Sequence, residues 1–82
     1  MTKLPRGLPA REVVKTLKKA GFYVRRQRGS HLIMRRDDPF SQVVVPRHKS
    51  IDTGTLDIIL EGANLSIEEF IELLKGKKSD HF

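Results

Sequence analysis

The stretch from Arg26 to His31 reads Arg-Gln-Arg-Gly-Ser-His and combines residue types that are suited to chemistry. Histidine is the side chain whose ordinary proton affinity suits acid–base work near neutral pH. Glycine lets a backbone turn sharply, and arginine offers a planar fork of donors to phosphate oxygens. A histidine at a basic turn is therefore a candidate for acid–base chemistry on a phosphodiester.

His31 is the candidate catalytic residue of this stretch. As a general base it would take the proton of a ribose 2′-hydroxyl, and as an acid it would protonate the leaving oxygen. Cleavage of that kind needs no metal ion and leaves a 2′,3′-cyclic phosphate. The alternative is a solvent-exposed turn histidine without a catalytic role, which the residue type alone favours.

The second candidate is His48, in the basic segment Pro46-Arg47-His48-Lys49. Two histidines would form an acid–base pair for RNA cleavage. A loop histidine that contacts phosphate or supports the loop is the alternative, and the sequence favours it. The histidines and carboxylates lack the spacing of metal ligands, and the chain has no cysteine. We therefore expect neither a metal nor a cofactor.

Basic side chains flank both histidines and are the candidate phosphate contacts. They are Arg26, Arg28, Arg35, Arg47 and Lys49, with Arg25 and Arg36 as further candidates. On an unbroken strand Arg26 and Arg28 share a side, and so do His31 and Arg35. The alternative is a set of charges that only keep the protein in solution.

Charge is unevenly divided along the 82 residues, whose net charge is +6. Residues 1–50 contain thirteen Lys or Arg against three Asp or Glu, and residues 51–82 contain three against seven. This asymmetry indicates a basic face for nucleic acid and an acidic face for another partner. Because only Tyr23 and Phe40 are placed to stack on bases, contacts with the RNA backbone or with helical shape are favoured over a stacking platform.

Length and composition exclude several classes of protein. A chain without cysteine has no disulfide framework. No apolar run approaches the ~20 residues of a membrane span, and the first residues lack the apolar segment of a secretory signal. We therefore expect a cytoplasmic protein with one small domain.

Hydrophobic spacing predicts a helix followed by three strands. The helix spans residues 10–20 and buries a face that contains Val13, Val14, Leu17 and Ala20. Gly21 suits its C-terminal end. The expected strands are residues 22–27, 31–36 and 41–45, which short turns join into an antiparallel meander. We expect Val43–Val45 to be a core strand.

Two further helices are predicted in the last part of the chain. Asp52 is the expected N-cap of the first of them, whose apolar face contains Leu56, Ile59, Leu60 and Ala63. Gly62 and Asn64 are expected to end it, and Ser66 with Glu69 predicts a capping box for a short last helix. The order α-β-β-β-α-α predicts an α+β fold, in which helices cover one face of a three-stranded sheet and the other face exposes arginine and lysine.

Together these segments resemble the HicA (YcfA-like) family, the toxins of HicA/HicB toxin–antitoxin systems. The resemblance covers about residues 4–74. It rests on the order and spacing of Leu4-Pro5-Arg6, Val13-Val14-Lys15-Thr16-Leu17, Ala20-Gly21-Phe22, Gln27-Arg28-Gly29-Ser30-His31, Val44-Val45-Pro46-Arg47-His48, Gly54-Thr55-Leu56 with Ile59-Leu60, and Leu65-Ser66 with Glu69-Phe70.

The resemblance implies a fold like that of double-stranded-RNA-binding domains, with one HicA-like domain over residues 1–75 and a frayed tail over 76–82. It implies the toxin of a type II system: a metal-independent endoribonuclease that cleaves mRNA and stops translation. It places the catalytic histidine in the Gly-Ser-His motif, here His31, with Gly29 shaping the turn and Ser30 orienting the site. It also implies a HicB-like antitoxin that covers the active site.

One segment departs from the family's pattern. The predicted helix after Gly54-Thr55-Leu56 carries Asp57 and Glu61 where basic residues are frequent. We therefore expect the strands and Arg47-His48-Lys49 to contact RNA, and this helix to face a protein. Two other function classes stay open. One is a non-catalytic RNA-binding module that uses the same basic sheet face, and the other is a protein-interaction domain without RNA affinity.

Overall fold

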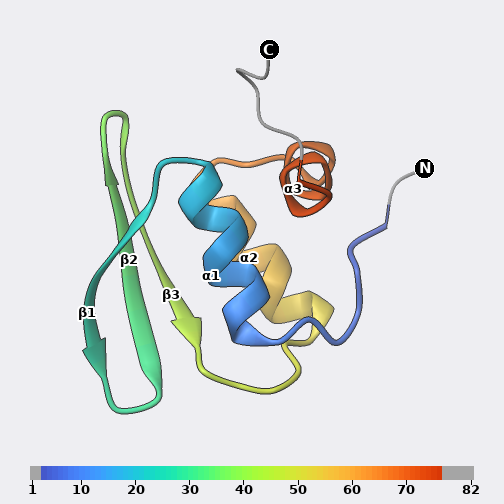
Figure 1. The fold of residues 1–82 in the computed structure, drawn as a ribbon, viewed down its shortest axis with the longest axis horizontal. Helices are drawn as coiled ribbons and strands as arrows, with labels where there is room; N and C mark the ends of the chain where they lie inside the picture. Colours follow the sequence, from blue (N-terminus) through green and yellow to red (C-terminus); the bar gives the residue numbers. More distant parts are fainter. Residues whose placement is uncertain (1–2, 77–82) are drawn as a thin grey trace.

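Three helices pack on one side of a three-stranded antiparallel sheet (Figure 1). The computed structural model describes residues 3–76, and its elements are α1 (Ala10–Lys19), β1 (Tyr23–Arg28), β2 (His31–Asp37), β3 (Phe40–Pro46), α2 (Thr53–Ala63) and α3 (Ile67–Leu74). This order confirms the predicted α+β fold. Apart from Gly76, the expected tail lies outside the described residues. No helix within residues 3–76 is long and apolar enough to cross a membrane.

Glycine closes α1 where the sequence predicts. Gly21 has a φ of +96°, a conformation that a side chain would strain. The backbone N–H groups of Gly21 and Phe22 donate to the carbonyls of Lys18 and Leu17. This is the hydrogen-bond pattern of a Schellman motif, and it sends the chain directly into β1.

Side-chain caps fix the starts of the last two helices, as predicted. Asp52 caps α2, and Ser66 and Glu69 form both hydrogen bonds of a capping box at α3. Asn64 ends α2 in the left-handed conformation, with a φ of 58°. The other predicted stop, Gly62, is wrong, because α2 continues through it.

The hydrophobic core lies between the helices and the two strands β2 and β3. Its buried residues are Ala10, Val13, Leu17, Phe22, Met34, Val43, Val45, Ile51, Leu56, Ile59, Leu60, Ala63 and Phe70. Gly62 serves this packing, since a Cβ there would lie 3.1 Å from Cγ1 of Val43. The predicted apolar face of α2 is fully buried, whereas Val14 of α1 and Ala20, the residue that follows α1, are only half-buried.

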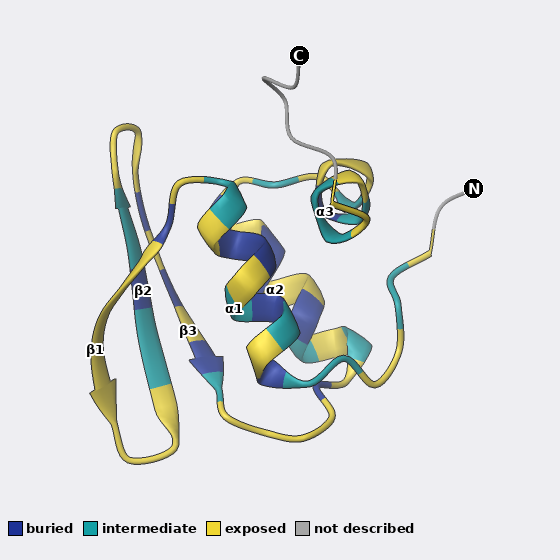
Figure 2. Ribbon diagram, in the orientation of Figure 1, coloured by how far each residue is buried: buried dark blue, intermediate teal, exposed yellow. Residues whose placement is uncertain are grey.

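The two faces of the sheet have different environments. In β3, Ser41, Val43 and Val45 are buried and the residues between them are exposed. Val44 is one of these exposed residues, so the expectation that the whole run Val43–Val45 is core is wrong for its middle residue. Every residue of β1 is exposed (Figure 2). The hairpin of β1 and β2 therefore extends beyond the helical layer.

Candidate functional site

The strand register gathers most of the predicted site residues on the outer face of the sheet, which is the face turned away from the helices. Residues directly opposite each other in an antiparallel ladder share a face. From the β1–β2 turn to the far end, the outer face consists of the rows Arg28–His31–Pro46, Arg26–Ile33–Val44, Tyr23–Arg35–Gln42 and Asp37–Phe40. Successive rows are about 7 Å apart along the strands.

A β-bulge in β1 brings two arginines onto the face of His31. The register shifts between Val24 and Arg26, so Arg25 is the extra residue. Without the bulge, alternation from Val24 would place Arg26 and Arg28 on the inner face, toward the helices. The bulge therefore decides that these arginines accompany the histidine.

A two-residue turn places His31 at the start of β2. Gly29 has a φ of +58°, as the first central residue of a type II′ turn requires. The Gln27 side chain donates to the carbonyl of Gly29 at 3.2 Å. The backbone N–H of Arg47 donates to the carbonyl of Ser30 at 2.7 Å. These bonds hold the turn against the end of β3 and leave His31 exposed.

The first two rows form the cationic half of the outer face. Arg28 lies directly opposite His31, and the Cβ atoms of such pairs are about 5 Å apart. Arg26 lies one row further along the strand. All three side chains are exposed, and no carboxylate belongs to these rows. A phosphate could therefore meet two guanidinium groups and an imidazole at the same place.

The last two rows form an arginine–aromatic half. The Tyr23 hydroxyl donates to both carboxylate oxygens of Asp37, at 3.2 and 3.0 Å. Desolvation raises the pKa of Tyr23, and this hydrogen bond raises it further, by a smaller amount. Nε of Arg35 lies 3.1 Å from Oδ1 of Asp37, and its guanidinium lies 5.1 Å from the centre of the Phe40 ring. Arg35 is therefore already engaged by an acid and a ring, unlike Arg26.

Arg36, the neighbour of Arg35 in sequence, lies on the inner face. Its guanidinium lies 4.8 Å from the centre of the Phe22 ring. It donates to the carbonyls of Pro39, Ala20 and Ala63 at 3.0, 3.4 and 3.3 Å. The last two carbonyls lie at the C-terminal ends of α1 and α2, where a positive charge is favourable. The position of Arg36 is thus explained by its contacts within the fold.

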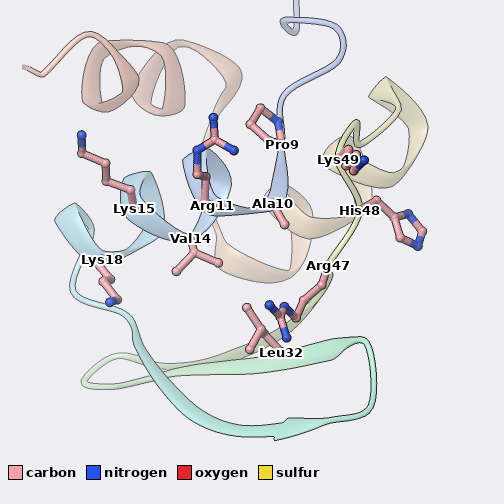
Figure 3. Close-up of a pocket in the computed structure, with 10 residues that line it drawn as sticks. All are labelled: Pro9, Ala10, Arg11, Val14, Lys15, Lys18, Leu32, Arg47, His48 and Lys49. Carbon is pink, nitrogen blue, oxygen red and sulfur yellow. The ribbon is translucent and has the colours of Figure 1, made fainter.

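A second cationic surface, the α1 hollow, lies between α1 and the hairpin (Figure 3). It has a volume of about 590 Å³ and is lined by Pro9, Ala10, Arg11, Val14, Lys15, Lys18, Leu32, Arg47, His48 and Lys49. Val14 and Lys18 project from α1 toward the sheet, where Leu32 lies on β2 and Arg47 follows β3 (Figure 3). The predicted phosphate contacts are therefore divided, because Arg47 and Lys49 accompany the cations of α1.

His48 lies with the α1 hollow and not on the outer face. Its carbonyl accepts a hydrogen bond from the N–H of Ala10 at 3.0 Å, and its imidazole points away from the hollow (Figure 3). Hydrogen bonds from Thr55 lower the pKa of Asp52, and the charge of His48 adds to this effect. His48 therefore lies in the loop after β3, outside the strand rows that place His31 on the outer face.

Sequence reasoning missed one group of residues and the placement of another. Arg11, Lys15 and Lys18 recur at i, i+4 and i+7, which is the spacing of one helical stripe. That signal was available from the sequence. The sequence identifies Tyr23 and Phe40 as the rings able to stack on bases, although it favours contacts with the RNA backbone. What the sequence missed is that the strand register places both rings on the face of His31. No sequence signal could have shown this, since it depends on cross-strand pairing.

Comparison with protein families gives a match. A family model for the HicA toxin of bacterial toxin–antitoxin systems matches residues 10–65. This range runs from the start of α1 past the end of α2, and it includes the turn before His31. No curated protein matches the chain. Within residues 3–76, no group of three or more His, Asp or Glu side chains is placed to hold a metal ion.

Proposed function

The chain belongs to the HicA toxin family of bacterial toxin–antitoxin systems, and from this membership we propose that it is an endoribonuclease that cleaves mRNA. Its catalytic residue is His31, which acts as general base and general acid. The observation that carries the proposal is the exposed His31 beside Arg28 and Arg26 on one open face of the sheet. An open face suits a polynucleotide better than a small molecule, which is usually bound in a closed pocket.

The proposed reaction is a transfer within the RNA strand. His31 takes the proton of the 2′-hydroxyl, the 2′-oxygen bonds to the adjacent phosphorus, and the bond from phosphorus to the 5′-oxygen breaks. The imidazolium then gives its proton to the 5′-oxygen. The products end in a 2′,3′-cyclic phosphate and a 5′-hydroxyl. Because the ribose supplies the nucleophile, the step does not need a metal ion to generate one.

Charge stabilisation in this scheme comes from β1. Arg28 and Arg26 hold the non-bridging phosphate oxygens, on which negative charge grows as the 2′-oxygen attacks. The space beside Gly29 is open, since a Cβ at this position would meet nothing within 4 Å. Arg47 and Lys49 bind phosphates further along the strand, from the α1 hollow. His48 takes no direct part, because it lies in the loop after β3, outside the strand rows that contain His31.

Membership in the family also implies an antitoxin partner. We extend the proposal to a HicB-like protein that covers the outer face. A partner on this face would exclude RNA from His31 without any change in the fold, because the face is open and its side chains are exposed.

The proposal is tested with a labelled single-stranded RNA in the presence of EDTA. The same strand is also made with a 2′-deoxy sugar on the 5′ side of the cleaved bond. We expect the all-ribose strand to be cut and mass spectrometry to find the cyclic phosphate. The deoxy-substituted bond should stay intact, because it lacks the nucleophile. Salt-sensitive binding without fragments would contradict the proposal and favour a non-catalytic RNA-binding module.

A further inference from the structure

Large apolar side chains are exposed on the same face as His31. Phe40 is 60% exposed, Val44 48% and Tyr23 42%. They lie in three successive rows of the outer face, at increasing distance from the turn. The whole chain has four Phe and one Tyr. Two of these five rings, Phe40 and Tyr23, are exposed to solvent and do not contribute to the hydrophobic core. Exposed rings among arginines are what unpaired bases stack on.

We propose that the far half of the outer face is a base-stacking site for single-stranded RNA, with Phe40 as the main platform and Tyr23 beside it. The proposal rests on the proposed function, in that the strand held here is the one cut at His31. It names the substrate class, since bases must be unpaired to lie on a ring.

Contacts within the far half hold this platform in place. Asp37 fixes the Tyr23 hydroxyl through two hydrogen-bond contacts and lies 3.1 Å from Nε of Arg35. Arg35 in turn lies against the Phe40 ring. A platform whose side chains are already positioned loses little conformational entropy when a base binds. The guanidinium of Arg35 also offers a flat surface of its own to a base.

The dimensions of the outer face fit one strand of RNA. Three row steps separate His31 from the row of Phe40, which corresponds to about 20 Å. Stacked nucleotides repeat at about 3.4 Å, so this distance corresponds to roughly six of them, and to fewer in an extended strand. Between the two ends lie Ile33 and Val44, which form an apolar surface over which the bases of the strand can lie. A strand can therefore place a phosphate at His31 and a base on Phe40.

The α1 hollow has no equivalent platform. Its lining contains five cations and His48 but no Phe or Tyr. It can therefore attract phosphates without distinguishing paired from unpaired bases. This difference assigns base stacking to the outer face alone.

The first test uses fluorescence, because the chain has no tryptophan. Phe40→Trp is made in a His31→Ala background, so that RNA binds without being cut. The matched control is Ile58→Trp, since Ile58 is 69% exposed and lies on α2. We expect single-stranded RNA to quench the emission of the Phe40→Trp variant saturably and to leave the control unchanged. Duplex RNA should bind, by anisotropy, without quenching. Binding of single strands without quenching would overturn the proposal.

The second test measures cleavage in the otherwise native protein. Phe40→Ala should lower kcat/KM on a long single strand at least about fivefold, the lower range for loss of one stacked base. It should leave a dinucleotide substrate unaffected, because a dinucleotide cannot reach from His31 to the platform. Ile58→Ala should change neither value. If Phe40→Ala leaves cleavage of both substrates unchanged and weakens only binding of the protein partner, the far half of the outer face serves that partner alone and the stacking site is excluded.

The two proposals fail separately in these tests. Quenching by RNA together with no cleavage by the native protein would contradict the ribonuclease proposal and support the stacking site. Cleavage together with no quenching would support the ribonuclease proposal and exclude the stacking site.

Discussion

The outer face and the α1 hollow both concentrate positive charge, but they differ in what accompanies that charge. The outer face combines Arg26 and Arg28 with an exposed histidine and two exposed rings. The hollow has more cations, yet its histidine, His48, points away from it (Figure 3). Charge alone therefore identifies where a polyanion is attracted, whereas the register of side chains around His31 identifies where a reaction can occur.

The largest expected effect comes from removing His31. His31→Ala should lower the cleavage rate at saturating protein by at least about 100-fold, because general acid–base catalysis contributes this much or more. RNA affinity and melting temperature should stay near those of the native protein, since the side chain is exposed. His48→Ala is the matched control and should cut RNA at close to the native rate. Equal losses in the two variants would contradict the distinction between the surfaces.

Paired charge removals separate cleavage from attraction. Arg26→Ala with Arg28→Ala should lower kcat/KM at least about tenfold, since bonds from charged donors contribute about 1.5–3 kcal/mol each. Lys15→Ala with Lys18→Ala removes the same charge from the α1 hollow. That variant should bind RNA more weakly. The slope of log binding constant against log salt concentration should become shallower by roughly 0.7 per lost phosphate contact. Its cleavage rate at saturating protein should be unchanged. A rate as low as that of the arginine variant would show that the α1 hollow contributes to cleavage as much as the outer face does.

The turn before His31 should show a smaller effect on cleavage. Gly29→Ala places a side chain at a φ of +58° without any steric contact, so only backbone strain of roughly 1–2 kcal/mol opposes it. We expect lower stability in urea unfolding and a severalfold slower cleavage, because the turn positions His31. Gly29→Asn should recover part of both losses, since asparagine is accepted better than alanine at the positive-φ positions of such turns. A Gly29→Ala variant with native stability would show that the turn is not constrained as described.

Substitution of the neighbouring arginines Arg35 and Arg36 should affect different properties, namely RNA affinity for Arg35 and stability for Arg36. Arg36 donates to three carbonyls on the inner face, so Arg36→Ala should reduce the free energy of unfolding by about 1.5–3 kcal/mol. Its cleavage rate at saturating protein should not change while it is folded. Arg35→Ala should affect RNA affinity more than stability. Chemical denaturation measures the stability of both variants, and fluorescence anisotropy measures their RNA affinity. Loss of RNA affinity in Arg36→Ala and loss of stability in Arg35→Ala would contradict these roles.

The smallest effect concerns pH and the start of α2, beside the α1 hollow. The hydrogen bonds from Thr55 hold the pKa of Asp52 below its ordinary value of 3.8. A group with a lowered folded pKa stabilises the fold above its ordinary pKa, and this stabilisation is lost as pH falls through the folded value. Asp52→Asn keeps an N-cap that does not titrate. Its melting temperature should therefore fall less between pH 6 and pH 3 than that of the native protein. An unchanged pH dependence would show that Asp52 does not contribute.

Features set by neighbouring residues could be predicted from the sequence. The capping box of Ser66 and Glu69 and the helix end at Gly21 need only a few consecutive residues to be recognised, and both are confirmed. The apolar face of α2 follows from helical spacing in the same way. Local chemistry therefore predicted the order of elements and the fold class.

Features set by pairing between strands could not be predicted. The bulge at Arg25 depends on how β1 meets β2, and it reverses the side on which every later residue of β1 lies. Exposure of Val44 likewise depends on which sheet face the helices cover. The catalytic role of His31 stays a prediction, since the fold positions the imidazole without testing its reaction.

The most direct test of the central claim, that RNA is held for cleavage on the outer face, is to map the bound strand by NMR. Single-stranded RNA with 2′-O-methyl groups lacks the nucleophile and would stay intact on the native protein. We predict the largest amide shifts from Arg28 to Ile33 and at Phe40, with smaller shifts at Arg47. Shifts confined to α1 and the loop after β3, with β1 and β2 unchanged, would contradict the account.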